Sequence, residues 1–170
     1  SFGSIVGSGP NSTSYHYRRN DRVMQAGDVV VMDMGALYQG YAADVTRTVP
    51  VSGTFTADQR AVYQLVRDAQ AAAEKLVRAG APVDAGSDAV RAVEAAGLAK
   101  LGLIESPDAT FDPPWPADCA SGSARCRQAF LYMAHGLGHG IGLEVHDAGG
   151  YSYSPTGTLQ LGDVFTIEPG

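Results

Sequence analysis

The stretch from His135 to Asp147 combines histidines and glycines in the pattern HGLGHGIGLEVHD. It contains His135, His139 and His146, which are three of the four histidines in the sequence. Imidazole is the commonest neutral metal ligand and the side chain most easily tuned for proton transfer near neutral pH. Glycines let the backbone approach a ligand closely, at an entropic cost that a purely structural segment would avoid. We therefore expect a metal-binding or catalytic site here, the alternative being three histidines that only satisfy hydrogen bonds in the interior.

Three acidic residues lie inside segments that otherwise read as apolar strands. Asp33 belongs to the β-branched run 28–34, Asp44 to the run 41–51, and Glu168 to the last ten residues. A carboxylate in such a strand is costly unless it is paired, hydrogen-bonded or bound to a metal ion. These acids are the natural partners for the histidine-rich stretch.

The spacing of Asp33 and Asp44 predicts that they face each other. A hairpin turn centred between Tyr38 and Gln39 would place them directly opposite on antiparallel strands, with Cβ atoms about 4.5–5.5 Å apart. Two ionised carboxylates would repel at that distance, so a cation between them is the expected explanation. The alternative is that one of the two is protonated or paired with Arg47.

The resulting donor set favours divalent metal ions. Three carboxylates and one imidazole suit hard or borderline ions better than a structural zinc site, which prefers cysteine and histidine. Bridging carboxylates also suit two ions about 3.5–4 Å apart, an arrangement common in aminopeptidases and phosphatases. The candidate ligands are Asp33, Asp44, His139 and Glu168, with His16, His135 and His146 as further histidines.

Two helices are predicted to position these residues by packing. Thr56 and Gln59 form a capping-box pattern, and apolar residues follow at helical spacing until Gly80. A second helix is expected over 86–101, with Gly102 as its end. Its inward residues are predicted to be Val90, Val93, Gly97 and Leu101.

The strands are predicted from β-branched and apolar runs bounded by turn residues. The expected strands cover 3–7, 28–34, 41–51, 129–133 and 141–145, and a turn followed by a strand is expected over 161–170. Between the helices and the histidine-rich stretch lies a Pro-rich excursion, 104–122, whose Trp115 would contact a substrate or anchor the loop. Irregular loops of this length are often lids or binding loops.

Two cysteines, Cys119 and Cys126, lie in a segment of small residues at the end of this excursion. The spacing permits a local disulfide, which would indicate an oxidising compartment, but two unpaired thiols fit the sequence equally well. No CxxC pattern is present, so neither cysteine is a candidate for redox or zinc chemistry.

Bulk properties restrict the class of protein. The 170 residues suffice for about one domain with a real core. The net charge of -6 and the lack of a Lys/Arg run argue against nucleic acid or an anionic membrane as a partner. No apolar run approaches the ~20 residues that span a bilayer, and no signal peptide is visible. The chain starts at Ser1, as if it were processed or excised.

Several motifs along the whole chain together resemble the pita-bread metallopeptidases. They are Tyr15–Tyr17, Met32–Gly35, Gly40–Thr48, the histidine-rich stretch and Ile167–Gly170. The His135/His139 pair, and Arg47-Thr48 followed by Phe55-Thr56, resemble the Xaa-Pro aminopeptidase and prolidase branch. Methionine aminopeptidases share the central motif but usually have His-Gly where this chain has His16-Tyr17. Creatinase shares the fold without metal.

The resemblance implies an α+β pita-bread fold, with a curved antiparallel sheet covered by helices, and a dinuclear metal site. Asp33, Asp44, His139 and Glu168 would be the ligands, with Asp44 bridging both ions. Glu168 would also act as general base or proton shuttle toward a metal-activated water. His16 and His146 would stabilise the oxyanion, and His135 would help to bind substrate. Two divalent ions are expected, with Mn²⁺ favoured and Co²⁺, Zn²⁺ or Fe²⁺ compatible.

The implied reaction is hydrolysis of the N-terminal Xaa-Pro bond of peptides or dipeptides. The alternative is a non-catalytic pita-bread module, or an inactive fragment, that binds peptides without turnover. The family normally continues beyond Ile167–Gly170 to a second bridging Glu, so we expect 1–170 to be an incomplete catalytic domain with an irregular insertion over 104–126. A homodimer is compatible with the resemblance. The cysteine pair favours an exported bacterial protein over a cytoplasmic one.

Overall fold

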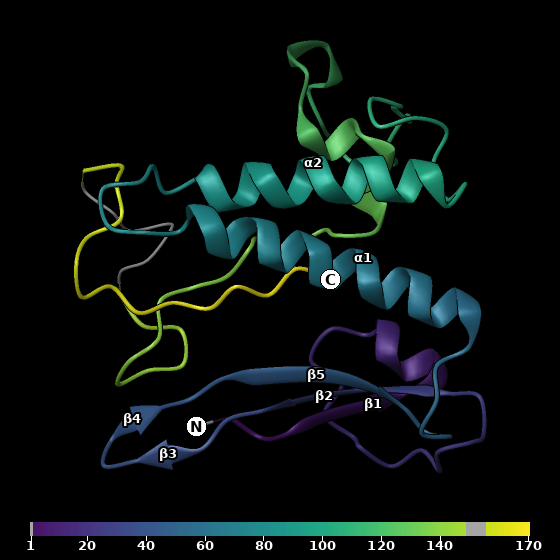
Figure 1. The fold of residues 1–170 in the computed structure, drawn as a ribbon, viewed down its shortest axis with the longest axis vertical. Coiled ribbons are helices and arrows are strands. Elements are labelled where there is room, and N and C mark those ends of the chain that lie inside the picture. The colour runs from purple at the N-terminus through teal and green to yellow at the C-terminus, as the bar shows by residue number, and fades with distance from the viewer. Residues whose placement is uncertain (1, 149–155) are drawn as a thin grey trace. The chain divides into compact units, whose positions relative to one another are not determined.

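The computed structural model describes residues 2–148 and 156–170, which form two compact units. Unit 1 contains residues 1–64, 139–153 and 162–166, and unit 2 contains residues 65–138, 154–161 and 167–170. The boundary falls within helix α1 (Ala57–Leu76), and Figure 1 shows the elements of both units. Each unit is described by itself below.

Unit 1 is built on a three-stranded antiparallel sheet with the order β1-β2-β5. The strands are β1 (Ile5–Ser8), β2 (Val29–Met34) and β5 (Val45–Pro50), which lie side by side in Figure 1. β-branched residues dominate β2 and fit a pleated, half-buried surface. Its Val30 is only 2% exposed, so the predicted strand over 28–34 is confirmed as the centre of the sheet.

A small hairpin extends this part of the chain and sets its register. Strands β3 (Leu37–Tyr38) and β4 (Tyr41–Ala42) are joined by Gln39 and Gly40, whose φ angles are 50° and 89°. Positive φ at both central residues is typical of the type I′ turns that match the twist of a hairpin. Tyr38 therefore pairs with Tyr41, and the turn is centred one residue later than predicted.

The predicted opposition of Asp33 and Asp44 is wrong. Asp33 pairs with Thr46, and the expected strand over 41–51 is interrupted, with Asp44 between β4 and β5. The interruption lies where the carbonyl oxygen of Ala43 closely approaches Gly35, at the position that a Cβ there would occupy. A two-residue difference in register thus follows from the turn at Gln39 and Gly40.

The outer edge of β1 is covered by one side chain. The side-chain amide of Asn20 accepts from Val6 N at 2.7 Å and donates to Ser4 O at 2.8 Å. It therefore makes the two hydrogen bonds that a neighbouring strand would make. The strand predicted over 3–7 is present, but it begins two residues later, at Ile5, and ends one residue later, at Ser8, where the 3₁₀ helix η1 (Gly9–Thr13) follows directly.

The first predicted helix is confirmed, including its N-terminal cap. Thr56 N donates to Gln59 Oε1 at 3.0 Å, and Gln59 N donates to Thr56 Oγ1 at 3.2 Å. These reciprocal bonds satisfy two of the free donors at the start of α1. The helix ends at Leu76, four residues before Gly80, which takes a φ of 84° in the following turn.

The second predicted helix is α2 (Ala85–Lys100), followed by Gly102 with a φ of 71°. Small residues on α2 allow close packing against the part of α1 that belongs to unit 2. A Cβ at Gly97 would collide with Leu65, and one at Gly86 would lie 3.0 Å from Val77 Cγ2. Figure 1 shows these two helices running side by side.

The inward face of α2 differs from the predicted one. Its buried residues are Gly86, Val90, Glu94 and Leu98. These residues recur every four positions and so form one stripe along the helix. Leu101 lies beyond the helix and is 39% exposed, so its predicted inward placement is wrong. The prediction missed Glu94 because it considered only apolar residues.

The excursion after α2 is irregular, as predicted, but it is held together locally. It contains two 3₁₀ helices, η2 (Cys119–Ser121) and η3 (Ala124–Cys126), and a disulfide joins Cys119 to Cys126. The ring of Trp115 lies 5.8 Å from that of Phe111 and 6.3 Å from that of Phe130. Trp115 therefore packs as an anchor of this loop.

The later predicted strands are not formed as continuous strands in the described residues. Residues 129–133 were expected to be extended, but the chain forms the 3₁₀ helix η4 (Gln128–Leu131). No residue of 141–145 forms a strand or a bridge, and segment 161–170 contributes only Phe165, which pairs with Gly140; Gly140 also forms an isolated bridge with Asp147. Glycines and turns every few residues limit the pairing in this part of the chain to single bridges.

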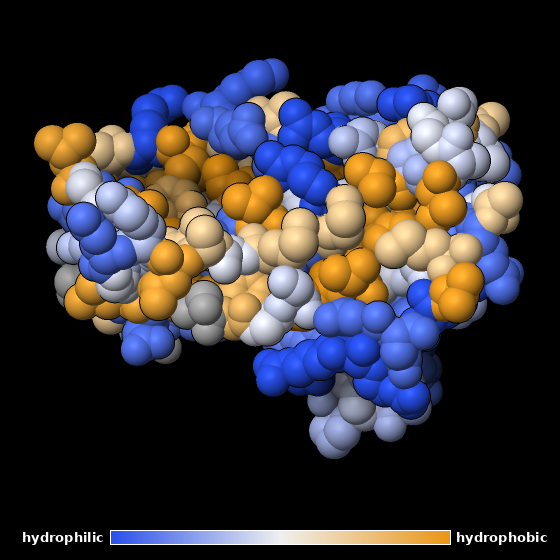
Figure 2. Space-filling view, turned by 90° about the horizontal axis from the view of Figure 1, so that it is seen from below, coloured by the Kyte–Doolittle hydropathy of each residue, from blue (hydrophilic) through white to orange (hydrophobic). Residues whose placement is uncertain are grey.

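Apolar side chains also reach the surface. On the face shown in Figure 2, hydrophobic residues are interspersed with hydrophilic ones. Among the large exposed residues, Leu161 is 95% and Val23 is 81% exposed. Within the described part of the chain, no helix is both long and apolar enough to cross a membrane.

Glu94 is the one charged residue among the buried side chains described, with 8% exposure. Burial raises the pKa of Glu94 from its usual 4.5 to about 7, although the electrostatic effect of His135 opposes the rise. The folded protein thus holds a proton on Glu94 at pH values where the unfolded chain has already lost it. The stabilisation this provides is complete below pH 4.5 and is lost as pH rises toward 7.

We predict that replacing this carboxyl group removes part of the pH dependence of folding. Each pKa unit corresponds to about 1.4 kcal/mol, so Glu94→Gln should raise the free energy of unfolding at pH 8 by up to about 3 kcal/mol. Thermal unfolding followed at pH 4 and pH 8 measures this difference. Glu74→Gln, on the exposed face of α1, is the matched control and should change nothing. An equal pH slope in Glu94→Gln and the unmodified protein would contradict the prediction.

Candidate metal centre

Unit 1 brings together five of the seven predicted site residues. The sheet supplies Asp33 from β2 and Asp44 from the connection between β4 and β5, and the glycine-rich loop supplies His139 and His146. His16 lies close enough to Asp33 to lower its pKa electrostatically. His16 also takes a left-handed backbone conformation, with a φ of 54°, which is uncommon for a residue with a side chain.

Asp33 lies in an environment that disfavours the charged form of its carboxyl group. Burial and the adjacent Asp44 carboxylate raise the pKa of Asp33 above its usual range, although a hydrogen bond with Thr46 acts in the opposite direction. The side chains of Asp33 and Asp44 are within hydrogen-bonding reach of each other, and Asp33 Oδ1 is buried without a hydrogen-bond partner. A bound cation would remove the repulsion and give this oxygen a partner.

His139 presents one ring nitrogen toward the same carboxylates. Its Nδ1 lies 3.0 Å from Gly140 O, and because a carbonyl oxygen only accepts, Nδ1 carries the proton. Its Nε2 lies 3.4 Å from Asp44 Oδ2 and, in the neutral ring, carries the lone pair. A hydrogen bond from the ring nitrogen that faces away from the metal commonly fixes the tautomer of a metal-binding histidine.

His146 lies against His139. The two rings are stacked, with centroids 3.9 Å apart and an angle of 26° between their planes. His139 is further held by its backbone, because His139 N donates to Thr166 Oγ1 at 3.0 Å. The arrangement places an exposed imidazole directly beside a candidate ligand, where it can hydrogen-bond to a substrate.

The other two predicted site residues, His135 and Glu168, belong to unit 2. His135 is exposed, and its Nδ1 and Nε2 lie 2.8 Å from Gly136 O and 3.1 Å from Gly170 O. The backbone of Glu168 is anchored beside this segment, since Glu168 N donates to Leu137 O at 2.9 Å. Local backbone bonds therefore hold both residues in their own unit.

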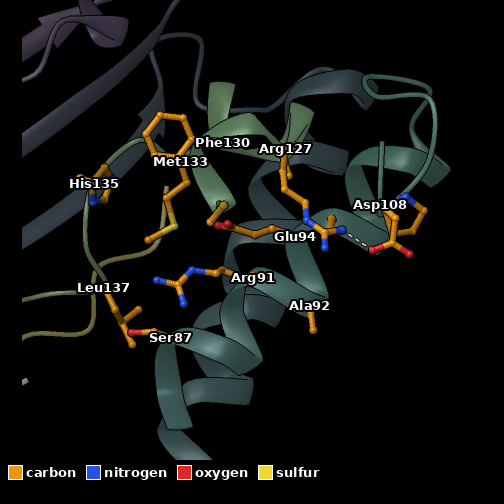
Figure 3. Close-up of a pocket in the computed structure, with 14 residues that line it drawn as sticks. Ser87, Arg91, Ala92, Glu94, Asp108, Arg127, Phe130, Met133, His135 and Leu137 are labelled. Atoms are coloured by element: carbon orange, nitrogen blue, oxygen red, sulfur yellow. Dashed lines mark hydrogen bonds and ion pairs between the residues drawn. The ribbon is translucent and has the colours of Figure 1, made fainter. Parts of the chain in front are cut away.

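Unit 2 also contains a cavity of about 470 Å³ between α2, the irregular excursion and η4. Figure 3 shows Glu94 and Arg91 reaching from α2 toward Met133, while Arg127 forms an ion pair with Asp108. His135 lines this cavity but none of the predicted metal ligands does. The cavity therefore shares no residue with the carboxylate and imidazole cluster of unit 1.

The donor set of unit 1 fits a divalent cation. Among the described residues, no group of three or more His, Cys, Asp or Glu side chains is arranged to hold a metal ion by itself. The contacts run in pairs, from Asp33 to Asp44 and from Asp44 to His139. The orphaned oxygen of Asp33 and the mixed oxygen and nitrogen donors are what hard or borderline ions prefer.

Sequence reasoning missed two supporting residues. Thr46 lies opposite Asp33 and acts to lower the pKa of its carboxyl group, and Thr166 holds the backbone of His139. Thr46 could have been found by centring the turn on Gln39 and Gly40. For Thr166 the sequence carries no signal, because its pairing depends on the way the glycine-rich loop folds.

An antiparallel sheet with two neighbouring aspartates beside a histidine agrees with a metallopeptidase of the pita-bread fold. Comparison with known proteins makes the class specific. The chain belongs to metallopeptidase family M24, whose model matches residues 1–170.

Similar proteins share this family and extend beyond the chain. Xaa-Pro aminopeptidases of Haemophilus influenzae and Escherichia coli are 38% and 37% identical over all of this chain, which spans 37% and 36% of their lengths. A solved structure of zinc-substituted E. coli aminopeptidase P in complex with product has a TM-score of 0.78 at 35% identity. That similarity covers 99% of this chain and 36% of the other. The chain therefore spans about a third of the relatives it matches.

We predict that the aspartates of unit 1 determine metal affinity. Asp44→Asn or Asp33→Asn should weaken Mn²⁺ binding by at least roughly tenfold, because even the loss of a supporting residue costs about that much. Because protons compete for Asp33, whose pKa is raised, affinity should fall as pH is lowered. Calorimetric titration with Mn²⁺ at several pH values measures both effects.

Asp84→Asn is the matched control for these variants, since Asp84 is exposed and makes no side-chain cap bond. It should bind Mn²⁺ as the unmodified protein does. Equal Mn²⁺ affinity in Asp44→Asn and the unmodified protein would contradict the proposed ligand role.

Proposed function

We propose that the protein of which this chain is a part is a metal-dependent exopeptidase that hydrolyses the N-terminal Xaa-Pro bond of peptides. The observation that carries the proposal is the cluster of Asp33, Asp44 and His139 in a chain of family M24. The Xaa-Pro aminopeptidases of H. influenzae and E. coli support the choice of substrate.

Four residues are proposed to hold two divalent ions, with Mn²⁺ favoured. They would be Asp33, Asp44, His139 and Glu168. When bound, divalent ions polarise a peptide carbonyl and make water more acidic. Asp44 would be central to this set because it lies near both Asp33 and His139.

The remaining histidines are proposed to act on the substrate. His146, stacked on His139, and His16, near Asp33, donate hydrogen bonds to the oxygen of the scissile carbonyl as negative charge develops there. His135 binds the substrate. Glu168 is proposed to take a proton from the attacking water and deliver it to the leaving nitrogen, as general acid–base catalysis requires.

We also propose an oxidising compartment, such as the bacterial periplasm, as the location of the protein. The disulfide between Cys119 and Cys126 supports this proposal, because such bonds persist outside reducing cytoplasm.

The activity is tested with the full-length protein that carries this chain. Loaded with Mn²⁺, it should release the first residue from a tripeptide with proline in second position, and not from the same peptide with alanine there. Chelation should abolish release, and added Mn²⁺ should restore it. A dipeptide with a C-terminal proline tests whether prolidase activity is also present.

Two results would contradict the proposed function. Full activity after complete metal removal would exclude a metal-dependent reaction. Binding of the proline peptide without turnover by the metal-loaded protein would indicate a non-catalytic peptide-binding module instead.

A further inference from the structure

We propose that Asp147 is a positioning residue that fixes the backbone spacing between His139 and His146, and thereby the relative position of their rings. The inference rests on the proposed function, since it concerns two residues of the same site. Residues 139–148, which form the loop with these histidines, belong to unit 1.

The carboxylate of Asp147 closes this loop with two backbone hydrogen bonds. Its Oδ2 accepts from Leu143 N and its Oδ1 accepts from Ala148 N, each at 2.8 Å. Both oxygens therefore bind backbone donors on either side of His146. An aspartate whose two oxygens are already engaged in this way acts on the backbone, which distinguishes it from the candidate ligand Asp33 with its unpaired Oδ1.

The backbone of Asp147 joins the two histidines across the loop. Asp147 N donates to Gly140 O at 2.9 Å, and these two residues form an isolated bridge. Gly140 directly follows His139, and Asp147 directly follows His146. The bridge therefore sets the spacing between the two histidine backbones, and with it the 3.9 Å separation of their stacked rings.

Gly142 provides the space for the Asp147 carboxylate. A Cβ added to Gly142 would collide with Asp147 Oδ2, so any larger residue must displace this oxygen. Gly142 N donates to Glu144 O at 3.0 Å, which keeps the turn compact. The φ of Gly142 is not positive, so its lack of a side chain serves close approach rather than an unusual backbone angle.

This geometry gives two independent ways to release the loop. Asp147→Asn keeps the shape of the side chain but leaves one oxygen acceptor in place of two. Gly142→Ala keeps the aspartate but pushes its carboxylate away from Leu143 N. Glu144→Gln is the matched control, because Glu144 is an exposed acid in the same loop with no side-chain hydrogen bond described.

The first measurement is hydrogen exchange at the Leu143 and Ala148 amides, together with the imidazole NMR signals of His139 and His146. Exchange at Leu143 should become faster in Gly142→Ala, and exchange at Leu143 or Ala148 should become faster in Asp147→Asn, while the signals of both histidines should move together. Glu144→Gln should match the unmodified protein. These readouts do not depend on activity.

The second measurement is peptide hydrolysis by the full-length protein at saturating Mn²⁺. Each loop variant should lower kcat roughly tenfold to a hundredfold, as loss of a supporting hydrogen bond at a metal site does. The double variant should be no worse than the more damaging single variant, because both act through one contact.

Several outcomes would overturn the proposal. They are unchanged exchange at both Leu143 and Ala148 in Asp147→Asn, histidine signals that stay in place while the loop opens, an unchanged kcat, or additive effects of the two variants. If the unmodified protein has no hydrolytic activity, the proposed function fails. The exchange and imidazole measurements then decide on Asp147 by themselves.

Discussion

Asp33 and Asp44 carry like charges within hydrogen-bonding reach of each other, and the rest of unit 1 accommodates this unfavourable pair. Strand β2 holds Asp33 half-buried, the turn at Gln39 and Gly40 reverses the chain, and the gap before β5 leaves Asp44 outside the strand pairing. A strand pairing that placed the two side chains directly opposite would fix their distance rigidly. With Asp44 outside the ladder, its carboxylate can lie near both Asp33 and His139.

Local signals in the sequence were sufficient for much of the fold. The reciprocal bonds of Thr56 and Gln59 and the strand around Val30 follow from short-range chemistry and composition, and both were predictable. The register between β2 and β5 was not predictable, because it depends on which two residues of the turn adopt positive φ. Gln39 is one of them, and it is not the Asn or Asp that usually occupies such a position. The segment 129–133 shows the same limit, since an apolar run alone does not distinguish a strand from the 3₁₀ helix that forms.

For the candidate site, the sequence indicated the types of residue but not the contacts that support them. Histidines separated by glycines suggested chemistry, and the structure places His139 and His146 in one stacked pair. Thr166 and Asp147 accept hydrogen bonds from the backbone of the glycine-rich loop. These bonds depend on how the loop folds, and the spacing of apolar residues in the sequence does not predict that. Glu94 was missed for a different reason, because hydrophobic spacing says nothing of a carboxyl group that is buried in its neutral form.

Asn20 has a consequence for how this chain can associate. Because its side-chain amide already bonds to Val6 N and Ser4 O, these two backbone groups at the outer edge of β1 are not available to pair with an incoming strand. Open edges of sheets are templates for intermolecular pairing and aggregation. Pairing of a second polypeptide with this part of β1 therefore requires displacement of the Asn20 amide, and removing that amide would expose Val6 N and Ser4 O to an incoming strand.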